Sequence, residues 1–282
     1  MMNNQILIST AAFDGYDLVT AISEIADIGA DAVELAFIEG YTDPFSEEDF
    51  NQTNADKIVT CLVKHNLTCL SFSAHMDLTK DQAVNIFHKR MVFARMLGAR
   101  YIVSNAAPLQ NRNQFMTNIG ELGQMAAELG ITIALENPGD GKPNVIDTAE
   151  QGARVIDEIG LDSVKINYDA GNLISHCFEK VKPEEDYLHA ISQTLHYHIK
   201  DVNRQGDSWE FTEIGQGMID YQCMLKEVAA DPRPLPLSLE IPLRITRAKD
   251  ASPIRAEAPV ELGKIRKVLT NSIDFVRKTV AN

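Results

Sequence analysis

Acidic residues and one histidine stand at the ends of several short apolar segments of this sequence. Glu136 follows "TIAL", Asp169 follows "VKINY", His198 lies in "LHYHIK" and Glu240 ends "LSLE". Carboxylate oxygens and an imidazole nitrogen are suitable ligands for a divalent ion such as Mn²⁺, Co²⁺, Zn²⁺ or Mg²⁺. Three carboxylates brought together would repel one another unless a positive charge lay among them. These four residues are therefore candidate ligands of one divalent metal ion.

Histidine and lysine alternate with other residues along the segment "TLHYHIKD" (194–201). In a strand, alternate side chains point to the same face, so His196, His198 and Lys200 would share one face. We expect His198 to be the metal ligand. His196 would lie one layer deeper, either as a packed residue or as a support for the site.

The candidate ligands lie in or directly after segments that have the character of buried strands. Each segment is short, nearly continuously apolar and mostly rich in β-branched or aromatic residues, which is typical of parallel strands covered on both faces. Eight segments share this pattern: 5–10, 32–37, 68–74, 101–106, 132–137, 164–169, 195–200 and 237–242.

Amphipathic segments follow each of these strands. In the segment 112–130, apolar residues recur at steps of three and four, which places them on one face of a helix, and Gly130 supplies a C-terminal stop. Similar glycine stops stand at 29, 98 and 160. The other predicted helices cover about 17–28, 55–65, 81–97, 147–159, 183–193, 220–230 and 261–280.

Strict alternation of strand and helix predicts a parallel sheet, and eight units favour closure into a (β/α)₈ barrel. We therefore assign the α/β class, with residues 1–282 forming a single TIM-barrel domain. An open doubly wound sheet would need a glycine-rich fingerprint after the first strand, and "TAAFDGYD" is not one. A long polar segment, 244–263, follows the last strand; with Arg244, Arg247 and Arg255 it is expected to form a wall of the site or a subunit contact.

In such a barrel the carboxyl ends of the strands meet at one mouth, where active sites form. Glu136, Asp169, His198 and Glu240 would converge there. A single acid or histidine at a strand end is more often a helix cap or a structural residue, but four compatible ligands on successive strands favour a metal site. His75, at the end of the third strand, either contacts the substrate or has a structural role.

Composition and charge exclude several classes of protein. The net charge of −14 disfavours nucleic-acid binding, because a phosphate backbone would be repelled. No apolar run approaches the roughly 20 residues that a membrane span needs, and the start "MMNNQILIST" does not resemble a signal peptide. The four cysteines form no CxxC pair, which predicts a reduced, cytoplasmic protein.

Five motifs in one order resemble the xylose-isomerase-like TIM-barrel superfamily, which includes sugar isomerases, sugar epimerases and endonuclease IV. They are "ALENP" (134–138), "NYDAGN" (167–172), "HYHIKDVNR" (196–204), "IGQGMIDY" (214–221) and "SLEIP" (238–242). The resemblance covers essentially the whole chain, but these motifs do not identify the substrate.

The resemblance implies that one metal ion is held by four residues that match the ligands of the ketose epimerases of that superfamily: Glu136, Asp169, His198 and Glu240. It also implies that the two glutamates serve as the acid–base pair. Arg204, six residues after the ligand histidine, matches an arginine that contacts substrate oxygens. Many members have a histidine three residues or so after the ligand aspartate, where this chain has Asn172, with His176 further on.

These features predict a metal-dependent isomerase or epimerase of a keto-sugar or sugar derivative. The substrate would chelate the metal through its carbonyl and a neighbouring hydroxyl, and the metal would stabilise an enediolate. One glutamate would remove a proton and the other would return one. We expect His75, Asn172, Arg204 and Trp209 to contact the substrate, Trp209 by stacking on the sugar, although a helix end would explain its position equally well.

Three alternatives remain at this stage. A lyase or dehydratase acting on a keto-sugar or cyclitol would use the same metal and bases. An endonuclease IV-like phosphodiesterase would need three zinc ions, but Asn105 and Asn172 stand where histidines are expected, and no Asp-x-His follows the seventh strand. A barrel that binds a ligand without catalysis is disfavoured by the intact ligand set. We also expect a homo-oligomer, either a dimer or a tetramer.

Overall fold

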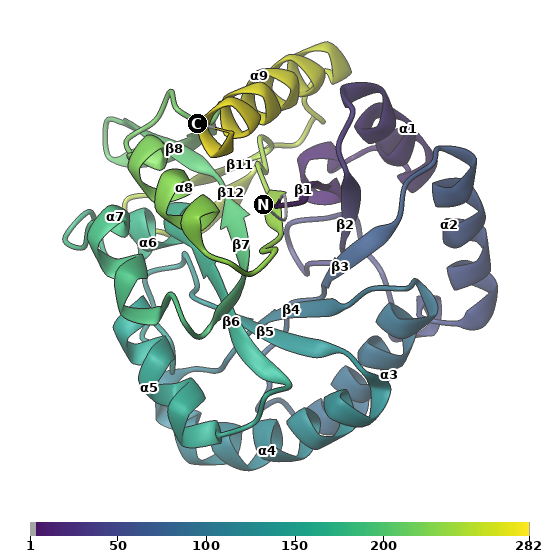
Figure 1. Cartoon of the computed structure of the whole chain (residues 1–282), viewed down its shortest axis with the longest axis vertical. Coiled ribbons are helices and arrows are strands. Elements are labelled where there is room, and N and C mark those ends of the chain that lie inside the picture. The colour runs from purple at the N-terminus through teal and green to yellow at the C-terminus, as the bar shows by residue number, and fades with distance from the viewer. Residues whose placement is uncertain (1–3, 282) are drawn as a thin grey trace.

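Eight parallel strands close into a barrel (Figure 1). The computed structural model describes residues 4–281. The barrel strands are β1 (Ile6–Ser9), β2 (Ala32–Ala36), β3 (Cys69–Ser73), β4 (Tyr101–Asn105), β5 (Thr132–Glu136), β6 (Val164–Asp169), β7 (Thr194–Ile199) and β10 (Leu237–Leu239). β1 closes the ring by pairing with β10 on one side and β2 on the other. The predicted (β/α)₈ barrel is confirmed, with all eight strands where the sequence pattern indicates them.

Helices surround the barrel on its outer side (Figure 1). They are α1 (Leu18–Ile28), α2 (Gln52–Lys64), α3 (Ala83–Met96), α4 (Arg112–Leu129), α5 (Ala149–Ile159), α6 (Ala170–His176), α7 (Pro183–Asp186), α8 (Tyr221–Ala230) and α9 (Leu262–Val280). Gly29, Gly130 and Gly160 end α1, α4 and α5 with positive φ, which confirms these predicted stops.

The predicted helix over 183–193 is wrong in length. α7 has four residues and continues as a 3₁₀ turn over Tyr187–Ala190. The side chain of Asp186, the last residue of α7, accepts hydrogen bonds from the backbone N–H of Ala149 and the hydroxyl of Tyr168. These long-range contacts fix the segment against α5 and β6, and they outweigh its helical pattern.

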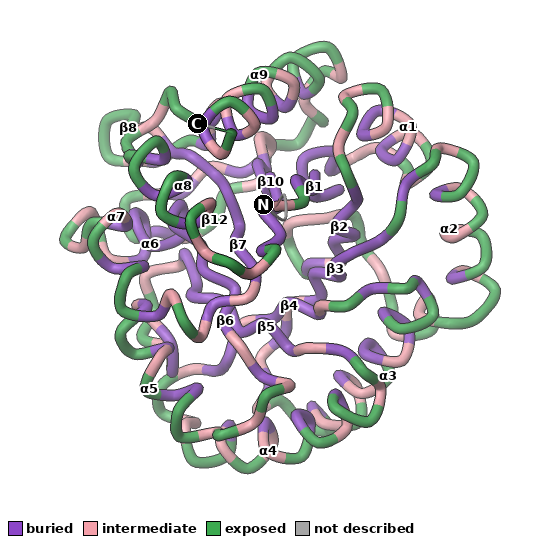
Figure 2. Tube along the Cα trace, viewed as in Figure 1, coloured by how far each residue is buried: buried purple, intermediate pink, exposed green. Residues whose placement is uncertain are grey.

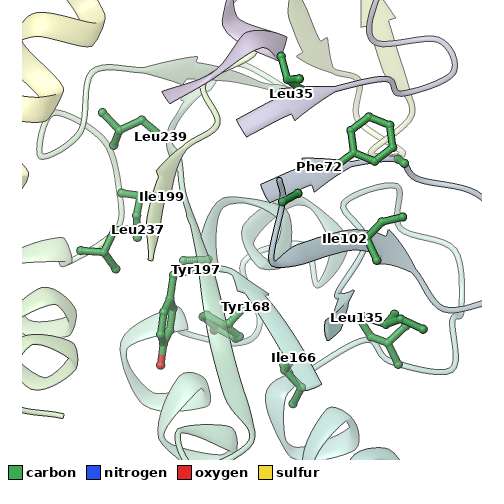
Figure 3. Packing of buried hydrophobic residues seen from close by; sticks show 14 of the residues in the cluster. Leu35, Phe72, Ile102, Leu135, Ile166, Tyr168, Tyr197, Ile199, Leu237 and Leu239 are labelled. Atoms are coloured by element: carbon green, nitrogen blue, oxygen red, sulfur yellow. The ribbon is translucent and has the colours of Figure 1, made fainter. Parts of the chain in front are cut away.

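Side chains alternate between the helices and the barrel interior. Those facing outward form the main core, and Figure 3 shows a ring of them spreading away from the strands. Its labelled members are Leu35, Phe72, Ile102, Leu135, Ile166, Tyr168, Tyr197, Ile199, Leu237 and Leu239. The strands and the inner helix faces are buried, while the outer helix faces are exposed (Figure 2).

A second, smaller antiparallel sheet forms outside the barrel. It consists of β8 (Asp201–Gln205), β9 (Ser208–Thr212), β11 (Ile245–Arg247) and β12 (Pro253–Arg255), in the order β12-β11-β9-β8. The polar segment 244–263, expected to be one long loop, therefore contains two strands. At three residues each, they are too short to show an alternating pattern, but their backbone groups find partners across the sheet.

Two arginines attach this sheet to Asp14, which ends the 3₁₀ turn Thr10–Phe13 that follows β1. Arg255 donates two hydrogen bonds to the Asp14 carboxylate, at 2.7 and 2.6 Å, and Arg244 lies 3.3 Å from the same carboxylate. The Asp14 side chain is 1% exposed. We call the segment 244–257, held by this aspartate, the arginine strap. Among residues 4–281, no helix is both long and apolar enough to cross a membrane.

Candidate active site

The four predicted ligands meet at the carboxyl ends of neighbouring barrel strands. Glu136 ends β5, Asp169 ends β6, His198 lies near the end of β7, and Glu240 directly follows β10. All four are buried, and one ligand atom from each lies within 4.8 Å of the others. The barrel topology thus brings together residues that are up to 104 positions apart in the chain (240 − 136).

His198 lies at the centre of this cluster. Its Nδ1 is 3.1 Å from Glu136, 3.3 Å from Glu240 and 3.7 Å from Asp169. Nevertheless His198 Nδ1 is buried without a hydrogen-bond partner. An unpaired imidazole nitrogen that faces three carboxylates fits a divalent ion.

Lys200 is a member of the site to which the sequence pattern gave no role. Its Nζ lies 2.7 Å from Asp169 Oδ2 and also contacts Glu240 Oε2. Burial would lower the pKa of Lys200, but Asp169 and Glu240 outweigh burial and raise it. Burial would also raise the pKa of Asp169, but Lys200 and His198 outweigh it and lower that pKa. Lys200 therefore supplies positive charge among the carboxylates. The sequence did contain a sign of this role, because Lys200 lies two residues after His198 and so shares a strand face with it.

Glu34, in the middle of β2, is the second residue that the sequence analysis missed. It is fully buried, and His198 Nε2 lies 3.1 Å from its carboxylate. Burial would raise the pKa of Glu34, but His198 and His196 outweigh burial and lower it. In the tautomer whose Nε2–H donates to Glu34, Nδ1 carries a lone pair and faces the space between the other carboxylates. A metal ion bound there would require this tautomer. An acid inside the apolar run "AVELAF" was the available signal.

The surrounding carboxylates favour the positively charged form of His198. Burial would lower its pKa, but Glu240, Glu34 and Glu136 outweigh burial and raise the pKa of His198 well above its ordinary value. The imidazole is therefore drawn toward its charged form wherever no ion is bound. A bound ion would take over this positive charge, since a ligating imidazole must be neutral.

Four polar side chains surround the carboxylate of Glu136. Asn172 donates to its Oε1 at 2.7 Å, and Asn167 donates to its Oε2 at 2.9 Å. His75 and His198 lie 3.3 and 3.1 Å from Oε2. Burial raises the pKa of Glu136, although His198 and His75 oppose this rise. The two amides fix the orientation of a carboxylate whose basicity is increased by burial.

His196 lies one layer below His198, as predicted. Its Nδ1–H donates to Asn167 at 2.8 Å, and its Nε2 is 3.5 Å from Glu34. Burial lowers the pKa of His196 to about 3, so the ring is neutral. Through Asn167 it supports Glu136, which is the supporting role that the sequence analysis left open.

A cavity of about 270 Å³ opens above the cluster. Its floor and sides include Glu136, Glu240, Lys200, His75 and Asn172. His75 and Asn172 thus both line this cavity, and their contact with a substrate stays a prediction.

The arginine strap completes the cavity wall. Arg247, Ser252 and Pro253 line the cavity together with Tyr41, which belongs to the segment after β2. The segment after the last barrel strand thus forms a wall of this cavity, which is one of the two roles expected of it, and the subunit contact stays a prediction.

Arg204 and Trp209 lie together outside this lining. Arg204 Nη1 is 3.1 Å from Glu179, and the indole N–H of Trp209 donates to the same carboxylate at 2.8 Å. The arginine is half exposed, whereas Trp209, a residue of β9, is buried and its ring packs beside that of Phe178. Substrate contacts by Arg204 and Trp209 remain predictions.

Asp201, the first residue of β8, has a structural role. Its carboxylate accepts hydrogen bonds from the backbone N–H groups of Gly215, Gly217 and Ile219. A Cβ on Gly217 would lie 2.1 Å from Asp201 Oδ1, so only glycine fits there. The segment "GQG" (215–217) is therefore a turn whose backbone is held by the Asp201 carboxylate.

Comparisons with known proteins agree with the barrel fold. A family model described as xylose isomerase-like TIM barrel matches residues 22–261. D-psicose 3-epimerase from Clostridium cellulolyticum H10 superposes with a TM-score of 0.77 at 14% identity, over 98% of this chain and 99% of that chain. The 3-keto-D-glucoside 4-epimerase YcjR from E. coli gives a TM-score of 0.72 at 16% identity, over 98% of this chain and 100% of that chain.

A probable 3-DHS dehydratase, AsbF from Bacillus anthracis, has the same fold. It superposes with a TM-score of 0.69 at 14% identity, over 97% of this chain and 98% of that chain. No curated protein sequence matches the chain significantly. At these identities the solved structures show the shared fold, and the family model carries the assignment to a family.

Proposed function

Because this chain belongs to the xylose isomerase-like TIM barrel family, we propose that it is a divalent-metal-dependent isomerase or epimerase acting on a keto-sugar or sugar derivative. The main support is the buried set of Glu136, Asp169, His198 and Glu240, with ligand atoms within 4.8 Å of one another. Two of the similar structures are epimerases of sugars or sugar derivatives by name.

Glu136 and Glu240 are the proposed acid–base pair. An ion bound at the site would act as a Lewis acid on the substrate carbonyl. One glutamate removes the proton from the carbon next to the carbonyl, and the other returns a proton from the opposite face, which inverts that carbon. Return of the proton to the neighbouring carbon gives aldose–ketose isomerisation instead. Burial, which raises the pKa of Glu136, strengthens it as a base.

His75 and Asn172 are proposed to bind substrate hydroxyls. Both line the cavity and both contact Glu136, so a hydroxyl held by them would lie next to the base. Among residues 4–281, the other group able to hold an ion is Glu34, His196 and His198, which shares His198 with the first. We therefore propose one ion per chain and not a three-zinc phosphodiesterase site.

A dehydratase is the second candidate, and Lys200 is the observation that favours it. Its ammonium group contacts Glu240 and lines the cavity. A cation at that position would stabilise the charge that develops on a departing hydroxyl, while Glu240 delivers the proton to that hydroxyl and Glu136 takes the proton from the adjacent carbon. One of the similar structures is a probable dehydratase by name.

The decisive experiment combines metal analysis with proton exchange. Protein loaded separately with Mn²⁺, Co²⁺, Zn²⁺ or Mg²⁺ is incubated with a panel of keto-sugars and their derivatives in D₂O, and the products are followed by NMR. Deuterium in a recovered sugar or its epimer supports the isomerase or epimerase, whereas loss of water supports the dehydratase. About one ion per chain is expected. Absence of both reactions with every metal, or three ions per chain, would overturn the proposal.

We also propose that the protein works in the cytoplasm as a dimer or tetramer. Cys61, Cys69, Cys177 and Cys223 are free thiols, which suits a reducing compartment. Light scattering of the purified chain tests the oligomeric state.

A further inference from the structure

Arg247, the last residue of β11, places a buried guanidinium in the wall of the cavity. The residue is 4% exposed and lines the cavity together with Lys200, Glu240 and Asn172. Its guanidinium carbon lies 5.4 Å from the centre of the Tyr41 ring, and Nη1 donates to the carbonyl oxygen of Ala251 at 3.3 Å.

The charge of Arg247 is not balanced within the part of the chain that the structure describes. Within 4–281 it forms no ion pair, and its Nε is buried without a hydrogen-bond partner. The two other arginines of the same strap, Arg244 and Arg255, both pair with Asp14. A buried guanidinium without a counter-ion is unfavourable in a folded protein, so a missing partner is expected to come from a ligand.

The other cations of the cavity are accounted for. Lys200 contacts Asp169 and Glu240, and Lys142 is exposed to water at the rim. Gly139 leaves the space that Arg247 occupies, because a Cβ there would lie 2.7 Å from Arg247 Nη2. The cavity of about 270 Å³ lies just below the range of about 300–1,000 Å³ that is usual for pockets of drug-sized ligands, so it suits a smaller molecule.

We propose that Arg247 binds an oxyanion of the substrate, so that the keto-sugar handled by this site is acidic. The inference rests on the proposed function and specifies its substrate class. A planar guanidinium presents two parallel donors that match a carboxylate or a phosphate, and such an oxyanion neutralises the buried charge, which a sugar hydroxyl cannot do. The anion would lie against Tyr41 and the strap, while the carbonyl end of the substrate lies at Glu136 and Glu240.

Binding of three non-reacting polyols of equal chain length tests the inference. D-Sorbitol is neutral, D-gluconate carries a carboxylate, and D-sorbitol 6-phosphate carries a phosphate. Calorimetry on the metal-loaded chain should show that one of the two anions binds at least about tenfold more tightly than sorbitol. The preferred anion distinguishes a sugar acid from a sugar phosphate. Loss of one charged hydrogen-bonding partner typically lowers affinity by about tenfold to a hundredfold.

Variants of the strap separate Arg247 from the general field of the site. Arg247→Met should lower the affinity for the preferred anion by about tenfold to a hundredfold and leave sorbitol binding unchanged. Lys249→Met is the matched control: Lys249 lies on the same strap, is exposed and pairs with Asp207. It should retain the full preference. If the methionine variant does not fold, Arg247→Lys gives the test, because it keeps the charge, loses the planar fork and should lose part of the preference.

Several outcomes would overturn the inference. These are equal or undetectable binding of the three polyols by the wild-type chain, an anion preference that survives in Arg247→Met, and an equal loss in Lys249→Met. Failure of the proposed reaction is distinguishable from these results. Proton exchange with neutral ketoses and no anion preference would leave the reaction standing, whereas anion binding through Arg247 without any proton exchange would leave only this inference.

Discussion

Two glutamates of the site lie in different surroundings, and this difference supports the acid–base pair proposed above. Glu136 is held by two amide donors and two imidazoles, whereas Glu240 contacts Lys200 and His198. Two acids with different neighbours can hold a proton with different affinity, which an acid–base pair requires. The arrangement therefore supports one carboxylate that receives a proton and one that returns it.

Replacing either glutamate should remove most of the turnover. We expect Glu136→Gln and Glu240→Gln each to reduce kcat by about 10²–10⁴-fold, because a positioned acid or base contributes about that much. Steady-state kinetics on the substrate found by deuterium exchange measures the loss. Metal content must be determined on the same samples, since both residues are also proposed ligands. Near-normal turnover in a metal-loaded variant would contradict the assignment.

Glu34 should act on the metal through His198. Removing its charge in Glu34→Gln is expected to weaken metal binding by about 10–100-fold, because a partner that orients a ligating histidine typically contributes that much. A competition titration against a fluorescent chelator gives the dissociation constant. Ser71→Ala serves as the control, because it removes one donor to Glu34, at 2.8 Å, and leaves the carboxylate in place. An unchanged dissociation constant in Glu34→Gln would show that Glu34 has no part in holding the ion.

At the scale of elements, the small sheet gives the barrel a wall that its own strands do not supply. β11 carries Arg247 into the cavity, and β12 carries the Arg255 contact to Asp14. The strap is thus attached to the segment after β1 through the buried carboxylate of Asp14. Movement of this attachment would move Arg247 relative to the glutamates.

Loss of the Asp14 carboxylate should loosen the strap. We expect Asp14→Asn to lower the free energy of unfolding by about 2 kcal/mol, because it leaves two partly buried guanidinium groups without a full counter-charge. Hydrogen exchange of the backbone amides of 244–257 should accelerate. Asp43→Asn is the matched control: Asp43 pairs with Arg255 but is 59% exposed, so we expect a change of about 0.5 kcal/mol or less. Equal protection of the strap amides in wild type and Asp14→Asn would rule out this anchoring role.

At the scale of the whole molecule, the site connects neighbouring strands that are distant in sequence. Its proposed ligands come from β5, β6, β7 and the residue after β10, so one ion would link strands that span the second half of the chain. In the structure, the charge of Lys200 holds the same carboxylates together. Metal binding should therefore stabilise the entire fold.

Metal removal should lower the melting temperature, and more so without Lys200. An ion present at about 100 times its dissociation constant adds about 2.7 kcal/mol, which corresponds to about 5 °C for a chain of this size. In Lys200→Met the metal-free protein should melt at a lower temperature, and the gain on adding Mn²⁺ should be larger, because the ion alone then balances Asp169 and Glu240. Lys249→Met should behave like the wild type in calorimetric scans with and without EDTA. A metal-induced gain that is the same in Lys200→Met would contradict this.

The sequence by itself determined the barrel and the four candidate ligands. Strand and helix periodicities are local properties, and eight alternating units restrict the topology to a form in which all strand ends meet. Glu136, Asp169, His198 and Glu240 could be found because each ends, or lies near the end of, a recognisable strand. Their convergence then followed from the fold class.

Only the tertiary structure decided which side chains surround these ligands. Glu34 contacts His198 across 164 positions of sequence, and Arg247 reaches the cavity from strands too short to give a pattern. Strand alternation placed Lys200 on the same face as His198, but its position between Asp169 and Glu240 depends on three strands at once. Arg204 was predicted from a spacing, yet its guanidinium pairs with Glu179. Period and spacing fix the direction of a side chain, whereas its partners depend on residues that only folding brings near.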